Sequence, residues 1–287
     1  MGSAREVLGI VVGDELMARW VGWFAPEVQP FLVPEGSALA ELGRAMDARP
    51  AAVEWRDTFG IYSPDEGLTC RGLTATEFRA LPRDRRAELV RGQRVAGRRL
   101  VPSVRAWPGL WGHGIREQAD GHRFVWWRDL LEGRELEALV PFVEGGMRRS
   151  RHAEVPAEVW RGAQRVLPGA AEQAGRFPAG SGPNCLATVM AASGVSDSST
   201  QWMQREPFEQ WLADRTRPGG RDDRPGTVLV WRSPEGLVQH VAVTLGDGWA
   251  LHKPSQGWMT PVKVLTVAEV LLSARCPGRR LTRRTVL

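Results

Sequence analysis

The fold of this chain is decided by three consecutive stretches: Gly226-Thr-Val-Leu-Val-Trp231, His240-Val-Ala-Val-Thr-Leu-Gly-Asp-Gly248 and Trp249-Ala-Leu-His-Lys-Pro-Ser-Gln-Gly257. Side chains alternate between the two faces of a strand, so the second stretch divides into two sets. One face carries Val241, Val243 and Leu245 and packs into a core. The other face carries His240, Ala242 and Thr244. We therefore expect an antiparallel arrangement in which one face of the strand leaves small side chains beside a histidine.

The turn between the second and third stretches decides whether His240 and His252 meet, because a register shift of one residue moves side chains to the other face. A two-residue turn would place the two histidines on opposite faces. A three-residue loop, Gly246-Asp247-Gly248, would place them on one face, roughly 7–8 Å apart between backbones. We predict this loop, with Gly248 in the left-handed conformation. It gives two cross-strand pairs: Leu245 with Trp249 and Ala242 with His252.

Cys185 lies upstream, after the run Ala179-Gly-Ser-Gly-Pro183. Apolar residues follow it at helical spacing until Gly194, which indicates a helix that begins near the cysteine. The unpaired backbone N–H groups and the dipole at a helix N-terminus favour a thiolate over a thiol. His240 would accept the thiol proton and His252 would fix the tautomer of His240. The sequence therefore predicts a nucleophilic site made of Cys185, His240 and His252.

These motifs together resemble the NlpC-type branch of the papain-like cysteine peptidases. That family has a Pro-Gly-Asp-hydrophobic strand, then a His-Val-Gly-Ile-Tyr strand, then an Ile-His-Ala-Pro segment. The chain has Pro225-Gly-Thr-Val-Leu-Val, His240-Val-Ala-Val-Thr and Leu251-His-Lys-Pro at the matching places, and the resemblance covers residues 175–265. It implies a nucleophile helix packed on an antiparallel sheet, with Cys185 as nucleophile, His240 as base and His252 as orienting residue.

The surroundings of the cysteine depart from the family pattern. The family reads Asp-Cys-Ser-Gly where this chain reads Asn184-Cys185-Leu186-Ala187, and the only tyrosine here is Tyr62 rather than one shortly before the nucleophile. The CHAP amidases, a sister group, often read Asn-Cys, which is compatible with amide chemistry. These departures support an alternative function, a catalytically inactive binding or interaction protein that keeps the fold.

The proposed chemistry is attack of the Cys185 thiolate on an amide or thioester carbonyl of a peptide or small molecule, which gives an acyl-enzyme. The backbone N–H of Cys185 and Asn184 would stabilise the oxyanion, and Trp231 and Trp249 would shape the substrate pocket. Water as acceptor gives a hydrolase; an amine or alcohol gives an acyltransferase. We expect no cofactor and no metal, although one thiolate and two imidazoles would also satisfy zinc.

Composition indicates a globular protein in a reducing compartment. The chain has 287 residues, 43% hydrophobic and 25% charged. Three widely spaced cysteines do not form a disulfide framework, no signal peptide is recognisable and no stretch could span a membrane, so we expect a cytoplasmic location. The net charge of +5 is carried by arginine, without a nucleic-acid-binding motif. The arginine run 83–99 is either a solvated helix face or a docking site for an acidic partner such as a carrier protein or RNA.

We expect an α+β protein of two domains. Residues 1–152 form a mostly helical domain of unassigned role, and residues 153–287 form the papain-like domain, with Arg148–His152 as the connector. In the first domain, Ser37 caps a helix through Met46, and Thr74-Ala-Thr-Glu77 is a capping box. At the other end of the chain, the tail 279–284 is expected to fray.

Overall fold

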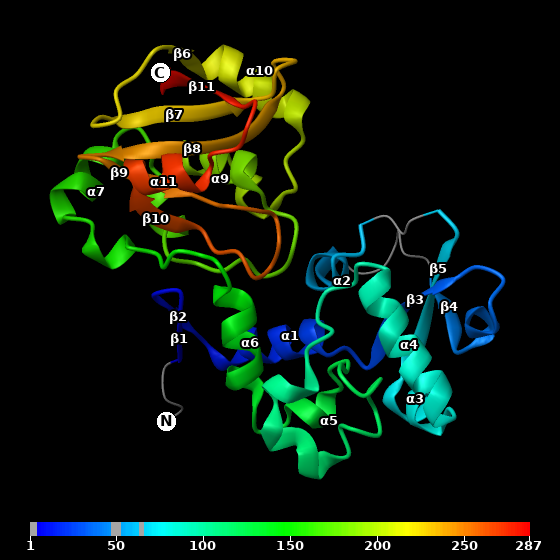
Figure 1. The fold of residues 1–287 in the computed structure, drawn as a ribbon. Coiled ribbons are helices and arrows are strands. Elements are labelled where there is room, and N and C mark those ends of the chain that lie inside the picture. The colour runs from blue at the N-terminus through cyan, green and yellow to red at the C-terminus, as the bar shows by residue number, and fades with distance from the viewer. Residues whose placement is uncertain (1–4, 47–52, 63–65) are drawn as a thin grey trace. The chain divides into compact units, whose positions relative to one another are not determined.

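The computed structural model describes residues 5–46, 53–62 and 66–287. The chain is α+β and divides into two compact units, residues 13–142 and residues 5–12 together with Val143–Leu287 (Figure 1). The first unit ends upstream of the connector Arg148–His152, where the sequence had suggested a boundary. Residues 143–152, which include the whole connector, therefore belong to the C-terminal unit, as do the first two strands of the chain.

The C-terminal unit is built on a six-stranded sheet in which every neighbouring pair is antiparallel. Its order is β10-β9-β8-β7-β11-β6. The strands are β6 (Thr216–Pro218), β7 (Pro225–Arg232), β8 (Val238–Gly246), β9 (Trp249–His252), β10 (Lys263–Thr266) and β11 (Arg280–Val286). The central position of β8, with neighbouring strands on both sides and cores on both faces, explains why all its residues except Gln239 are buried.

Helices cover the two faces of this sheet (Figure 1). On one face, α9 (Cys185–Ala192) packs on the core that contains Val241, Val243 and Leu245. On the other, α11 (Val267–Ser273) packs on a smaller core that contains Trp231 and Ala242. The remaining helical elements of this unit are η4 (His152–Glu154), α7 (Ala157–Gln164), α8 (Ala170–Gln173), η5 (Ser198–Thr200) and α10 (Arg205–Arg215).

The first strands of the chain, β1 (Arg5–Val7) and β2 (Ile10–Val12), form a hairpin that is tied to the start of this unit. The backbone N–H of Leu8 donates to the Glu144 carboxylate at 2.9 Å, and the backbone N–H of Ser150 donates to the Leu8 carbonyl at 2.7 Å. These bonds explain why residues far apart in the sequence belong to one compact unit.

The N-terminal unit combines helices with a three-stranded antiparallel sheet of order β3-β5-β4. The strands are β3 (Val28–Pro34), β4 (Arg44–Met46) and β5 (Leu68–Thr74). The helical elements are α1 (Asp14–Phe24), η1 (Ala38–Glu41), α2 (Val53–Phe59), α3 (Ala75–Ala80), α4 (Arg83–Val95), η2 (Val104–Ala106), η3 (Pro108–His113), α5 (Arg128–Leu131) and α6 (Glu135–Glu144), where the chain passes into the C-terminal unit.

The predicted helix from Ser37 through Met46 is wrong, because a short 3₁₀ turn is followed by β4. Gly43 has a φ of +56° and lies so close to β5 that a Cβ atom would stand 2.2 Å from the carbonyl oxygen of Gly72. The capping box is confirmed, since the Thr74 side chain accepts from the Glu77 N–H and the Glu77 side chain accepts from the Thr74 N–H. The apolar pattern that follows divides at Pro82 into α3 and α4.

The expected fraying of the tail 279–284 is also wrong. β11 inserts between β7 and β6 and pairs Leu281 with Trp231 and Arg284 with Pro218. The Arg283 guanidinium forms an ion pair with Asp222 at 2.7 Å. An arginine-rich segment thus forms an interior strand of the sheet, in which Arg283 pairs with Asp222 and Arg284 donates to the Thr216 hydroxyl.

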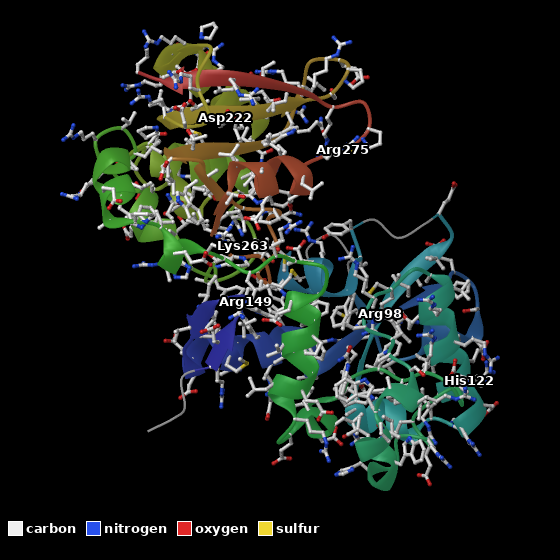
Figure 2. The ribbon with its side chains drawn as sticks, turned by 60° about the vertical axis from the view of Figure 1, so that its left-hand side comes forward. Arg98, His122, Arg149, Asp222, Lys263 and Arg275 are labelled. Atoms are coloured by element: carbon white, nitrogen blue, oxygen red, sulfur yellow. The ribbon has the colours of Figure 1, made fainter. Side chains whose placement is uncertain are left out.

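The arginine run 83–99 is not a uniformly solvated face. Arg98 (Figure 2) is only 4% exposed, its Nη2 donates to the Gln29 side chain, and its guanidinium lies 4.5 Å from the ring centroid of Phe59. Burial lowers the pKa of Arg98 to about 9. Docking of an acidic partner on the remaining arginines of the run stays a prediction.

Within the described ranges, the structure contains no helix that combines the length and the apolar character needed to cross a bilayer.

We predict that Gly169→Ala destabilises the C-terminal unit by about 1–3 kcal/mol, because the new Cβ would overlap the α9 backbone. At Gly169 a Cβ atom would stand 2.3 Å from the Ala191 carbonyl oxygen. Gly162→Ala in α7 is the matched control, since a Cβ there meets nothing within 4 Å. It should stabilise the unit by about 0.5–1 kcal/mol. Hydrogen exchange of the α9 amides measures both effects; equal protection in the two variants would contradict the prediction.

Candidate functional site

The register between β8 and β9 brings the two histidines onto one face. Ala242 pairs with His252, as the sequence predicts. The turn itself differs from the prediction: Asp247 and Gly248 form a two-residue turn with φ of +50° and +75°, as in a type I′ hairpin, and Gly246 rather than Leu245 pairs with Trp249. A bulge between Thr244 and Gly246 supplies the extra residue. The predicted loop is therefore wrong, but the predicted histidine register is confirmed.

The two imidazoles are joined by a hydrogen bond between His240 Nε2 and His252 Nε2 at 2.9 Å. The rings are perpendicular, with centroids 4.9 Å apart, and only 7% of His240 and 2% of His252 are exposed. His252 Nδ1 is buried without a hydrogen-bond partner. One ring therefore donates and the other accepts, which requires that the pair holds no more than one additional proton.

Burial keeps this pair neutral. It lowers the pKa of His240 to about 4, with a smaller contribution from the charge of Arg279. It lowers the pKa of His252 well below the ordinary value, assisted by the charges of His240, Lys263 and Lys253. Lys263 (Figure 2) pairs directly with His252 across β10 and β9, is 2% exposed, and has a pKa lowered to about 8 by burial. At neutral pH both imidazoles are therefore uncharged.

Cys185 is the first residue of α9, as predicted, and Asn184 is the N-cap. Asn184 Oδ1 accepts from the Ala187 N–H at 3.0 Å, while Nδ2 donates to the Met203 carbonyl at 2.8 Å. The predicted oxyanion role of Asn184 is thus not what its side chain does in this structure, because both of its polar atoms hold the helix start. The oxyanion donors that the geometry offers are backbone N–H groups at the first turn of α9.

The thiol is not activated in the way the sequence suggested. Burial raises the pKa of Cys185 and outweighs the opposing effects of the backbone N–H groups of Val241, Leu186 and Cys185 and of the Lys253 charge. The helix N-terminus does favour the thiolate, as expected, but by less than desolvation disfavours it. The resting form of Cys185 at neutral pH is the thiol.

The structure brings the histidines together but does not join the thiol to them. Cys185 packs against the core that contains Val241, whereas His240 pairs with Trp231, a member of the core on the other face of the sheet. In the described structure no hydrogen bond links the sulfur to either imidazole, and the described residues include no group of three His, Cys, Asp or Glu side chains that could hold a metal ion. Val241 connects the two groups along the chain, because it directly follows His240 and its backbone N–H hydrogen-bonds to the Cys185 sulfur.

The two predicted pocket tryptophans have other surroundings. Trp231 is 4% exposed and its ring centroid lies 5.4 Å from that of His240, so it packs against that imidazole. Trp249 is half-buried under the Arg151 guanidinium, 4.9 Å from its ring centroid. Neither tryptophan lines the cavity described next.

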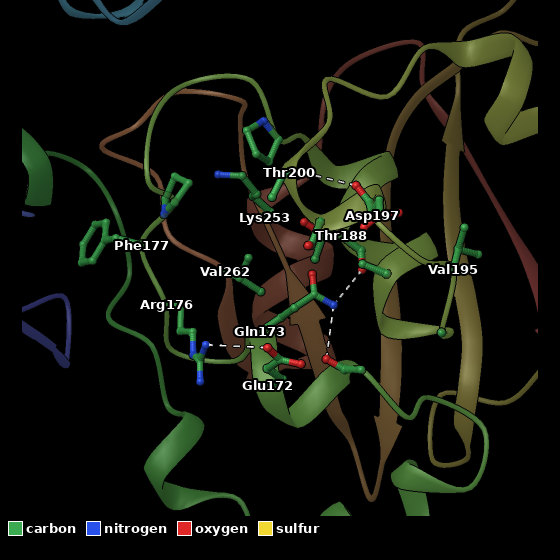
Figure 3. Close-up of a pocket in the computed structure, with 16 residues that line it drawn as sticks. Glu172, Gln173, Arg176, Phe177, Thr188, Val195, Asp197, Thr200, Lys253 and Val262 are labelled. Atoms are coloured by element: carbon green, nitrogen blue, oxygen red, sulfur yellow. Dashed lines mark hydrogen bonds and ion pairs between the residues drawn. The ribbon is translucent and has the colours of Figure 1, made fainter.

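A cavity of about 440 Å³ lies against α9 (Figure 3). Pro183 and Thr188, which flank Cys185 in the sequence, form part of its wall together with Lys253. Gln173 reaches from α8 towards α9, and its amide donates to the carbonyls of Gly169 and Thr188 at 3.3 and 3.4 Å (Figure 3). The rim includes Glu172, Arg176, Phe177 and Asp197.

Sequence reasoning missed the two buried lysines. Lys253 is 1% exposed and its ammonium donates to the Thr260 carbonyl, and Lys263 Nζ donates to the Arg148 carbonyl at 3.0 Å. A signal was available in the composition: Lys253 and Lys263 are the only lysines in a chain otherwise rich in arginine. Both lie within or next to the strands that carry the histidines.

We predict that Asn184→Ala destabilises the C-terminal unit by about 1–2 kcal/mol, because the helix loses its cap. Asn184→Asp, which keeps the accepting oxygen, should retain most of the stability. Urea unfolding of the two variants measures the difference. An Asn184→Ala protein as stable as the wild type would contradict the structural role of this side chain.

We also predict that the C-terminal unit loses stability as the pH falls from 6.5 to 4. His240 has a folded pKa of about 4 against an ordinary 6.5, so the unfolded chain binds the proton first and acid favours unfolding. At 1.36 kcal/mol per pKa unit, His240 alone contributes about 3 kcal/mol over this interval. Urea unfolding across this range should show a shallower pH slope in His240→Asn than in the wild type. The control His122→Asn alters an exposed loop histidine, and equal slopes in all three proteins would exclude the effect.

Comparison with known proteins leaves the site to be interpreted from its own residues. The chain matches no protein-family model, no curated protein and no solved structure.

Proposed function

We propose that the C-terminal unit is a papain-like thiol enzyme, a hydrolase or acyltransferase that forms an acyl-enzyme on Cys185. The observation that carries this proposal is the 2.9 Å bond between His240 and His252, on the strand whose Val241 N–H acts on the Cys185 sulfur. A neutral histidine oriented by a second polar ring is the arrangement that a general base requires. Cys185 packs with the core on the other face of β8 from His240, so this chemistry requires that the thiol comes within hydrogen-bond distance of the imidazole when a substrate binds.

The hydrogen bond between the rings determines which nitrogen acts as base. His240 Nε2 is engaged by His252, so the proton of the thiol has to go to His240 Nδ1. Nδ1 accepts a proton only when Nε2 carries the hydrogen, so in this assignment His240 donates to His252. His252 then carries its own hydrogen on Nδ1, and it stabilises the imidazolium that forms on His240 by accepting its Nε2–H.

The reaction then follows from these positions. The Cys185 sulfur attacks the carbonyl carbon as its proton moves to His240, and the carbonyl oxygen becomes an oxyanion beside the backbone N–H groups at the start of α9. The leaving amine or thiol takes the proton from His240. Attack of water on the thioester releases an acid, while attack of an amine or alcohol transfers the acyl group.

A second function, binding without catalysis, is favoured by one specific observation. The thiol has a raised pKa, and no hydrogen bond joins it to the neutral imidazoles. A protein that has kept the fold but lost the reaction would look like this. The two functions differ in whether His240 increases the reactivity of Cys185 towards an acyl donor.

We predict that p-nitrophenyl acetate acylates Cys185. The experiment uses a variant with Cys70→Ala and Cys276→Ser, so that Cys185 is the only thiol, and follows release of p-nitrophenolate at pH 7.5. Mass spectrometry of the Cys185 peptide should show the acetyl group. His240→Ala should slow acylation by about 10²–10⁴-fold, because the base is lost, whereas His122→Ala should have no effect.

The same experiment decides between the two functions. Acylation of Cys185 at the same slow rate with and without His240, in folded protein, would reject the enzyme and favour the binding role. Whether added amines accelerate the loss of the acetyl group then distinguishes transfer from hydrolysis.

A further inference from the structure

We propose that Lys253 is a positioning residue of the thiol site, whose buried ammonium, on the loop bonded to the segment before Cys185, supplies positive charge that stabilises the reacting sulfur as a thiolate. This inference rests on the proposed function and concerns the same site. It assigns to Lys253 the electrostatic role that a histidinium would have in a site with a charged imidazole.

The geometry places Lys253 on the loop that leaves β9 and in the wall of the cavity that lies against α9. It follows His252 directly at the end of β9, and it lines the cavity together with Pro183 and Thr188, on either side of Cys185 in the sequence. Its side chain is 1% exposed and is anchored on the Thr260 carbonyl. A buried ammonium in a poorly solvated interior has a weakly screened field, and the Lys253 charge acts on the Cys185 thiol.

Two hydrogen bonds fix the loop of Lys253 against the loop that precedes Cys185. The Gly182 N–H donates to the Gln256 carbonyl at 2.9 Å, and the Trp258 N–H donates to the Ser181 hydroxyl at 3.1 Å. Within the loop, Ser255 and Thr260 share a hydrogen bond of 2.9 Å between their hydroxyls. The lysine and the cysteine are therefore held by segments that are directly bonded to each other.

The other groups around the thiol do not supply this charge. α9 contains no charged residue, and His240 and His252 are neutral at pH 7. Glu172 and Asp197 line the cavity but carry negative charge. The Lys253 charge favours the thiolate of Cys185, in addition to the three backbone N–H groups.

The same charge also acts on the base. Lys253 and Lys263 both lower the pKa of His252, so the two lysines help to keep the imidazole pair unprotonated. The positive charge stabilises the thiolate and disfavours an imidazolium at rest. The thiol proton should therefore move to the imidazole only as the sulfur reacts. The family motif that this segment resembles has alanine at the position of Lys253, so the lysine is a property of this chain.

The test is the pH dependence of Cys185 alkylation by iodoacetamide in the Cys70→Ala, Cys276→Ser background. Lys253→Met removes the charge and keeps most of the side-chain length; we expect the alkylation profile to move up by about one pH unit, with about tenfold slower labelling below the midpoint. Lys253→Arg should retain the wild-type profile. Lys263→Met is the matched control, because Lys263 acts on His252 rather than on the sulfur. An unchanged profile in folded Lys253→Met overturns the inference.

A second measurement needs no lysine variant and applies if Lys253→Met does not fold. With only two lysines in the chain, ¹³Cε-labelled lysine gives two NMR signals. Capping Cys185 with the neutral carboxamidomethyl group should change the titration of the Lys253 signal, because the thiolate that favours its protonation is removed, and leave Lys263 unchanged. Identical titration of Lys253 with and without the cap overturns the proposal.

These outcomes are independent of the acylation test. A profile that depends on Lys253 in a protein that His240→Ala does not slow would keep the electrostatic role and reject the enzyme. A protein that needs His240 but not Lys253 would keep the enzyme and reject this role.

Discussion

The histidine pair depends on one extra residue in β8. A type I′ turn at Asp247-Gly248 joined to a regular ladder would pair the two strands one residue out of step, and His252 would point to the opposite face from His240. The bulge between Thr244 and Gly246 takes up this residue and restores the pairing of Ala242 with His252. The backbone requirement falls on Gly246, whose φ of +99° is a conformation that residues with a Cβ rarely adopt. The relative position of two imidazoles is thus determined by backbone geometry outside the site.

Burial is the main influence on the charge states of the histidine pair and of the titratable groups near it. Desolvation is the largest influence on the pKa of Cys185, His240, His252 and Lys263, and in each case it favours the neutral form. A preformed thiolate–imidazolium pair would require two charges in this interior, each of which would have to be compensated. The neutral pair of thiol and imidazole needs no such compensation at rest. Charge separation would then occur only when a substrate carbonyl is available to receive the electrons.

Local signals in the sequence were sufficient for elements that depend on neighbouring residues. The start of α9 at Cys185 and the capping box at Thr74 follow from turn and cap residues within a few positions. The predicted register of the histidines was correct although the predicted loop was wrong. Side-chain alternation shows that one extra residue is needed between the two histidines, but it does not show whether that residue lies in the loop or in a bulge. The strand β11 and the strand β4 were missed, since their partners β7 and β5 lie far away in the sequence.

In the candidate site, too, some features follow from the local sequence and others depend on how distant segments pack. His240 and His252 could be placed on one face from periodicity, whereas the position of the thiol relative to them depends on how α9 packs on the sheet, which periodicity does not contain. The role of Asn184 as a cap could have been read from its position before a helix, where asparagine is favoured for the hydrogen bond that it makes here. The lysines illustrate a different limit: their scarcity marks them as unusual, but only the fold shows that both are buried beside the histidine strands. The charge states of the thiol and the imidazoles, with two buried lysines near them, are determined by desolvation. Desolvation depends on how the whole structure packs and is not contained in any sequence motif.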